Sequence, residues 1–171
     1  MPVRPIQSTP SLLQVDSILL HLTGIEALGE VCRFLRHEFR HYRWVGIYLR
    51  DGGTLRLAAW AGPQETEHVT IPVDQGICGK AAREDRSVIV DDVRATPEYL
   101  ACFLETRSEI VVPIRAGGAV VGEIDIDGNE VKAYDASDER FLTAVAQRVA
   151  ALAVQVQPEV VAGRPPLRGG G

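Results

Sequence analysis

Residues 101–127 read Ala-Cys-Phe-Leu-Glu-Thr-Arg-Ser-Glu-Ile-Val-Val-Pro-Ile-Arg-Ala-Gly-Gly-Ala-Val-Val-Gly-Glu-Ile-Asp-Ile-Asp, and this stretch decides the fold. It holds two apolar runs rich in β-branched residues, at 110–114 and 119–126. Arg-Ala-Gly-Gly separates them, and a glycine-containing turn between two such runs predicts an antiparallel β-hairpin.

Four polar or reactive residues lie inside or beside this hairpin: Cys102, Glu109, Asp125 and Asp127. The two aspartates share one side of their strand, because alternate residues of a strand point to the same face. Polar groups in segments that otherwise predict core are costly to bury without partners. The four are therefore either paired structural groups or a functional site.

Strand-like and helical patterns alternate along the rest of the chain. Helical spacing of apolar residues covers 11–22, 25–39 and 135–156, and a short helix follows Gln75. Strand-like segments bounded by turn residues lie at 44–49, 54–60, 68–72, 87–91, 110–114 and 119–126. Short connections between strands argue against a parallel sheet. We expect an α+β fold with an antiparallel sheet of about six strands and with the N- and C-terminal helices on one face.

The domain organisation follows from proline and glycine placement. Residues 1–10 hold three prolines and predict a flexible arm, and 11–157 predict a single domain. Asp135 is expected to cap the last helix and Pro158 to end it. The Gly- and Pro-rich segment 158–171 is expected to be disordered.

Composition excludes several classes of protein. The chain has 171 residues, a net charge of −5 and no cluster of basic residues, so nucleic acid is not an expected partner. No apolar run is long enough to span a membrane, and the N-terminus does not resemble a signal peptide. The three cysteines are odd in number and widely spaced, which is typical of a cytoplasmic protein with reduced thiols.

Each candidate residue also has a structural interpretation. Cys32 falls on the apolar stripe of a helix and is expected to be an inert core thiol. Cys78 has two interpretations: its thiol is activated by the backbone N–H groups at a helix start, or it is simply a small residue that fits a crowded turn. Asp127 could cap a turn, and Glu109 could pair with Arg107 or Arg115 at the surface.

Three motifs together resemble the GAF domain, and more narrowly its free methionine-(R)-sulfoxide reductase branch. They are Gly76-Ile-Cys-Gly-Lys-Ala-Ala, Ser108-Glu-Ile-Val-Val-Pro-Ile and Val121-Gly-Glu-Ile-Asp-Ile-Asp. The resemblance covers roughly residues 15–156.

The resemblance assigns roles to the residues that match the motifs. It implies a catalytic cysteine at Cys102, seven residues before Glu109. It places the family's two acids at Asp125 and Asp127 and a further cysteine at Cys78. The aromatic residues of its pocket fall on Trp44 and Tyr48, in a Trp-x-Gly-x-Tyr strand.

The chain departs from the family pattern at two positions. His68 stands ten residues before Cys78, where the family usually has its resolving cysteine. Phe103 follows the matched cysteine, where the family usually has aspartate.

The implied activity is thiol-dependent reduction of free methionine-(R)-sulfoxide, with Cys102 as the nucleophile. The acids would bind the amino group and protonate the sulfoxide oxygen, and Trp44 would add a cation–π face. The resulting sulfenic acid would be reduced by Cys78 or by an external thiol, either a thioredoxin or a small reductant. No cofactor is implied, and the thiols, His68 and the acids lack a recognised metal-ligand spacing.

Another interpretation is a non-catalytic GAF module that binds a small molecule or senses redox state. The long apolar terminal helices also favour a homodimer. Neither the identity of the reductant nor the distance between Cys78 and Cys102 follows from the sequence.

Overall fold

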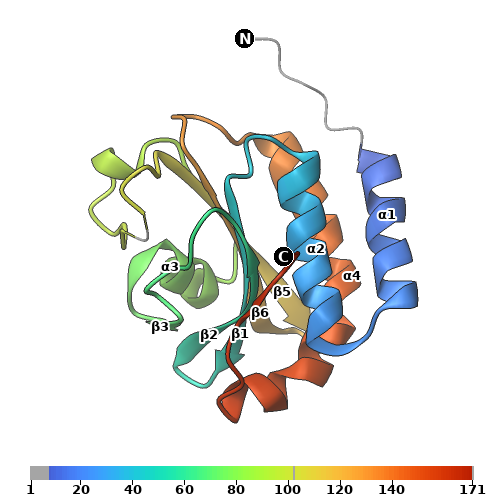
Figure 1. The fold of residues 1–171 in the computed structure, drawn as a ribbon. Helices are drawn as coiled ribbons and strands as arrows, with labels where there is room; N and C mark the ends of the chain where they lie inside the picture. The colour runs from blue at the N-terminus through green and yellow to red at the C-terminus, as the bar shows by residue number, and fades with distance from the viewer. Residues whose placement is uncertain (1–7, 102, 171) are drawn as a thin grey trace.

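The computed structural model describes residues 8–101 and 103–170, which form a sheet covered by helices on both faces (Figure 1). The sheet order is β3-β2-β1-β6-β5-β4, and β7 pairs with β2. The helices are α1 (Ser8–His21), α2 (Gly24–Glu38), α3 (Gly76–Glu84) and α4 (Ala136–Val161), with a 3₁₀ turn at Val93–Ala95. The strands are β1 (Trp44–Asp51), β2 (Thr54–Ala61), β3 (Thr70–Pro72), β4 (Val88–Val90), β5 (Ser108–Ala116), β6 (Ala119–Gly128) and β7 (Leu167–Arg168).

The arrangement confirms the predicted α+β architecture. Strands β1 to β6 pair antiparallel throughout, and α1, α2 and α4 lie on the same side of the sheet (Figure 1). The shorter α3 lies on the other side. None of the helices described between residues 8 and 170 is long and apolar enough to cross a membrane.

The central hairpin forms as its sequence predicts. Gly117 and Gly118 both have positive φ, at 59° and 78°, which only a residue without Cβ adopts easily. They close the turn between β5 and β6. On the helix-covered face of β6, Ile124 and Ile126 are fully buried in the main core. Each such side chain stabilises the fold by about 1.5–3 kcal/mol.

The predicted cap of the last helix is also confirmed. The Asp135 carboxylate accepts from the backbone N–H groups of Ser137 and Asp138, and the Asp138 carboxylate accepts from the Asp135 N–H at 3.0 Å. This is a capping box, which satisfies orphan donors at the start of α4. Asp138 also accepts from the Tyr42 hydroxyl at 2.8 Å, so the cap is joined to the segment before β1.

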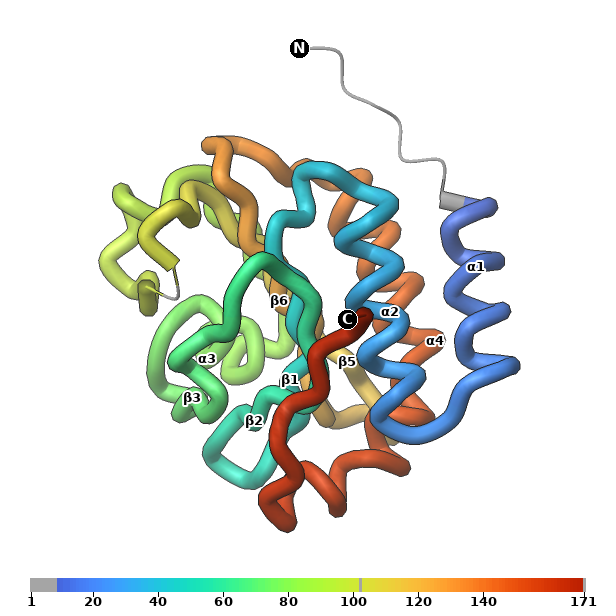
Figure 2. Tube along the Cα trace, viewed as in Figure 1, coloured from blue at the N-terminus to red at the C-terminus, as the bar shows by residue number. Residues whose placement is uncertain are grey.

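The C-terminus differs from the prediction. Helix α4 continues through Pro158 to Val161, and β7 pairs parallel with β2. The N–H that Pro158 lacks would have reached the Val154 carbonyl, and Val154 is an exposed residue that water can solvate. The segment then runs beside α2 (Figure 2), where a Cβ at Gly169 would lie 1.9 Å from the Gly29 oxygen. The absence of a side chain at Gly169 therefore lets this segment pack on α2, whereas the sequence predicted that 158–171 would be disordered.

Candidate active site

Four carboxyl groups gather on the face of the sheet that α3 covers. Glu123, Asp125 and Asp127 alternate along β6, and Glu109 of β5 lies opposite Asp127. Their exposed fractions are 0%, 0%, 2% and 4%. We refer to these four residues as the acid cluster.

Glu123 is the member that the sequence analysis missed. Its signal was present, because a period of two leads from Asp127 through Asp125 to position 123. Among the described residues, no backbone N–H, lysine or arginine donates a hydrogen bond to the carboxylate oxygens of Glu123, Asp125 or Asp127. Buried acids without such donors are costly, which is typical of a ligand site.

The surface interpretations of these acids were wrong. Arg115 bonds the Asp85 carboxylate at 2.5 Å, and Arg107 reaches Asp92 at 3.5 Å. Glu109 points to the buried face instead. Asp127 does not cap the turn either, because neither of its carboxylate oxygens has a hydrogen-bond donor among the described residues.

Helix α3 brings Cys78 onto the acid cluster. The helix packs closely on the segment before it, since a Cβ at Gly79 would lie 2.7 Å from the Val73 carbonyl oxygen. The Cys78 sulfur and carboxylate oxygens of Glu109 and Asp125 all lie within 4.8 Å of one another. Cys78 is only 4% exposed, so its thiol faces the acids rather than solvent.

The burial of these groups opposes their ionisation. Burial raises the pKa of Glu109, and the charges of Asp125 and Asp127 raise it further. Burial raises the pKa of Asp125 to about 6, although hydrogen bonds with Glu109 and Cys78 act in the opposite direction. Burial also raises the pKa of the Cys78 thiol well above its usual range, with Asp125 as the next cause. The cluster therefore favours either bound protons or a cationic group.

An aromatic wall stands beside the cluster. The Trp44 ring occupies space that glycine leaves open, since a Cβ at Gly46 would lie 2.4 Å from it and one at Gly62 only 2.2 Å. Phe103 packs on this ring at 5.6 Å between centroids, and Trp60 stacks on it at 6.4 Å. Trp44 is thereby fixed as a wall.

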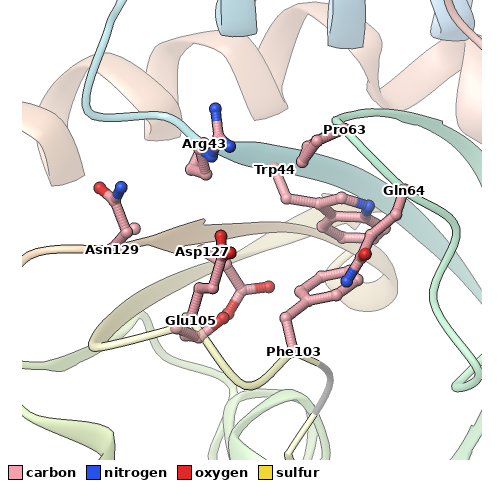
Figure 3. A pocket seen from close by; sticks show the side chains of 10 residues that line it. Arg43, Trp44, Pro63, Gln64, Phe103, Glu105, Asp127 and Asn129 are labelled. Carbon is pink, nitrogen blue, oxygen red and sulfur yellow. The ribbon is translucent and has the colours of Figure 1, made fainter.

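A pocket of about 110 Å³ opens between this wall and the outermost acid. Figure 3 shows Trp44 and Phe103 on one side and Asp127 and Glu105 on the other. The lining residues are Arg43, Trp44, Pro63, Gln64, Phe103, Glu105, Thr106, Asp127, Gly128 and Asn129. The pocket suits a small molecule with one apolar and one cationic end.

The predicted site residues occupy different positions around this pocket. Trp44 and Asp127 line it, whereas Glu109 and Asp125 lie in the acid cluster beyond Asp127. Tyr48 is fully buried on β1, directly opposite Glu123, and its hydroxyl donates to the His68 carbonyl at 2.8 Å. Sequence reasoning missed Glu105 and Gln64 as lining residues, because both come from loops without a pattern.

Two of the three cysteines are placed by the structure. Cys32 is fully buried in the main core, as predicted, and burial raises the pKa of its thiol. Cys78 lies at the acid cluster. The predicted nucleophile, Cys102, is outside the described residues. Its neighbour Ala101 accepts a hydrogen bond from His68, and Phe103 packs on Trp44.

Similar proteins extend these observations. A GAF domain-containing protein A from Dictyostelium discoideum is 34% identical over 136 residues, which is 78% of this chain and 84% of that protein. The free methionine-R-sulfoxide reductase of Escherichia coli is 30% identical over 118 residues, covering 69% of this chain and 70% of that enzyme. The structure of free methionine-R-sulfoxide reductase from Neisseria meningitidis, in complex with its substrate, is 29% identical with a TM-score of 0.82. That match covers 94% of this chain and 96% of the other.

The family model for the GAF domain matches residues 25–152, which span β1 to β6, α3 and most of α2 and α4. This range holds both the acid cluster and the aromatic wall. Since the model matches more than half of the sequence, the chain belongs to the GAF domain family.

Proposed function

We propose that this protein reduces free methionine-(R)-sulfoxide to methionine, with Cys102 as the nucleophile. The observation that carries the proposal is the pocket between an aromatic wall and a buried acid cluster. Similarity to the Escherichia coli and Neisseria meningitidis enzymes, which carry this activity in their names, supports it. A location in the cytoplasm and a homodimer are further parts of the proposal.

The acidic side of the pocket matches the ammonium group of a free amino acid, and the aromatic side matches the methionine side chain. An ammonium group beside Asp127 would supply the positive charge that the acid cluster lacks. Arg43 lines the same pocket and suits the α-carboxylate of the ligand. The methyl and sulfur of the side chain would lie against Trp44 and Phe103, because sulfur packs well on aromatic rings. A methionine inside a peptide lacks the ammonium group, so the proposed site selects the free amino acid.

The chemistry requires a nucleophile and a proton. The Cys102 sulfur attacks the sulfoxide sulfur, and the protonated oxygen passes to Cys102 as the S–O bond of the substrate breaks. Cys102 thereby becomes a sulfenic acid, and methionine is released. The sulfoxide sulfur is reduced by two electrons and the cysteine sulfur is oxidised by two. Glu109 and Asp125 are the proposed proton donors, because their burial favours the neutral acid that can protonate the oxygen.

An external thiol is the proposed reductant for the sulfenic acid. It attacks the oxidised Cys102 to give a mixed disulfide and water, and a second thiol then releases the enzyme. A thioredoxin or a small thiol could serve. Burial and the neighbouring acids raise the pKa of Cys78 and leave little thiolate for this step. We therefore propose that Cys78 contributes to catalysis by its contact with Glu109 and Asp125.

A second candidate function is binding of a small cationic molecule without turnover. The acid cluster and the aromatic wall would hold such a ligand whether or not a cysteine reacts. The two functions differ in thiol consumption, which only the reductase requires.

The test is to follow the loss of free methionine-(R)-sulfoxide in the presence of a small dithiol. We expect the wild-type protein to consume the R epimer, and Cys102→Ser to lose at least about 100-fold in kcat/KM because the nucleophile is gone. Cys32→Ser is the matched control, since Cys32 lies in the main core. Binding of the sulfoxide by the wild type without turnover would favour the second candidate, and equal activity in Cys102→Ser would exclude the proposed nucleophile.

A further inference from the structure

His68 is held at its backbone on both sides. Its N–H donates to the Thr66 hydroxyl at 3.0 Å, and its carbonyl accepts from the Tyr48 hydroxyl at 2.8 Å. Thr66 is 6% exposed and Tyr48 is fully buried on β1. The ring of His68 therefore projects from a well-defined point beside the strand that carries Trp44.

The ring forms a contact across 33 residues of sequence. Its Nε2 lies 3.0 Å from the Ala101 carbonyl oxygen. A carbonyl oxygen only accepts, so Nε2 carries the proton and the ring donates. Both the neutral tautomer protonated at Nε2 and the imidazolium keep this donor.

The acceptor belongs to the segment between the 3₁₀ turn and β5. Ala101 is exposed, as is Leu104. Of the backbone hydrogen bonds in this region, those of the Tyr99 N–H to Thr96 and of the Thr106 N–H to Phe103 are local. Phe103 packs on Trp44, and the His68 bond joins Ala101 to the segment after β2. These two contacts, one on each side of position 102, tie the segment to the pocket.

We infer that His68 is a positioning residue, which holds Ala101 beside the pocket through the Ala101 carbonyl. The inference rests on the proposed function for its kinetic consequence, because this segment contains the proposed nucleophile. Displacing a reacting group by about 1 Å can cost about 100-fold in rate. Trp44 and Asp127 lie on strands and do not depend on this bond, whereas Phe103 lines the pocket from the tethered segment.

Three variants separate positioning from other roles. His68→Ala removes the donor, whereas His68→Gln keeps an N–H at a similar reach. Glu67→Ala is the control, because it truncates the exposed neighbour and leaves the ring in place. If His68 acts by positioning, His68→Ala lowers kcat about 10- to 100-fold and raises KM by a smaller factor through Phe103, and His68→Gln restores most of kcat.

Hydrogen exchange of the full chain tests the tether without any turnover. We expect the hydrogen-bonded amides of Tyr99 and Thr106 to exchange at least about tenfold faster in His68→Ala than in the wild type, and to recover in His68→Gln and Glu67→Ala. Unchanged exchange in His68→Ala overturns the inference, and so does a His68→Gln variant as slow in kcat as His68→Ala, which would indicate acid–base chemistry by the ring. A wild type without reductase activity contradicts the proposed function alone, and the exchange data still decide the tether.

Discussion

At the scale of single residues, the acid cluster is the most unusual feature of the chain. Glu123 is fully buried, and neither of its carboxylate oxygens accepts from a backbone N–H, lysine or arginine among the described residues. Burial raises its pKa well above the usual value, while a hydrogen bond with the Cys78 thiol and the charge of Arg50 act in the opposite direction. A folded state that holds a proton more tightly than the unfolded chain loses stability as the pH rises above the unfolded pKa.

Glu123→Gln should therefore stabilise the fold in a pH-dependent way. The glutamine amide is neutral at every pH and can donate a hydrogen bond to the neighbouring Asp125. The variant therefore avoids the free-energy cost of burying an ionised carboxylate, or of keeping the carboxyl protonated at high pH. Thermal unfolding at about pH 8 should show a higher Tm than the wild type, and the difference should shrink toward about pH 4.5, where the unfolded glutamate is also protonated. A Tm difference that is the same at both pH values, or a lower Tm at pH 8, would show that charge at this position is not the cause.

At the scale of the elements, α4 depends on its N-terminal cap. The hydrogen bond from Ser137 lowers the pKa of Asp135, and the backbone N–H groups of Ser137 and Asp138 act in the same direction. A lowered pKa in the fold means that the stabilisation is present above the unfolded pKa. It is then lost as the pH falls through the lower, folded value.

Asp135→Ala should cost about 1 kcal/mol of unfolding free energy near neutral pH, because it removes the acceptor of the capping box. The loss should diminish as the pH falls below about 4 and should vanish below the lowered folded pKa, where the wild-type carboxylate is itself protonated. Urea unfolding measures both values. Asp91→Ala is the matched control, since it removes an exposed aspartate outside any helix cap. A similar loss in the control would mean that the effect is not specific to the cap.

At the scale of the whole molecule, the sheet has one structural and one functional face. Helices α1, α2 and α4 bury the main core on one face, and α3 covers the pocket face on the other (Figure 1). Successive side chains of β6 point to opposite faces of the sheet. Ile124 and Ile126 therefore lie in the main core, and the acids between and beside them lie on the pocket face. Leu13 and Leu20 are exposed on α1. The homodimer expected from the apolar terminal helices stays a prediction.

The sequence predicted what local pattern and spacing determine. The hairpin, the α4 cap and the shared face of Asp125 and Asp127 all follow from short-range rules. The bond between His68 and Ala101 joins residues far apart in the chain, so no local pattern contains it. The docking of Gly169 on Gly29 is equally nonlocal, which is why the tail was predicted to be disordered.

A single turnover without added thiol shows directly whether Cys102 is the nucleophile. Reduced wild-type protein is mixed with excess free methionine-(R)-sulfoxide and a reagent that traps sulfenic acids, and both methionine and the modified cysteine are measured. We expect about one methionine per chain, an adduct on Cys102, and no methionine from the S epimer or from Cys102→Ser. An adduct on Cys78 in place of Cys102, or no methionine from the wild type, would contradict this role of Cys102.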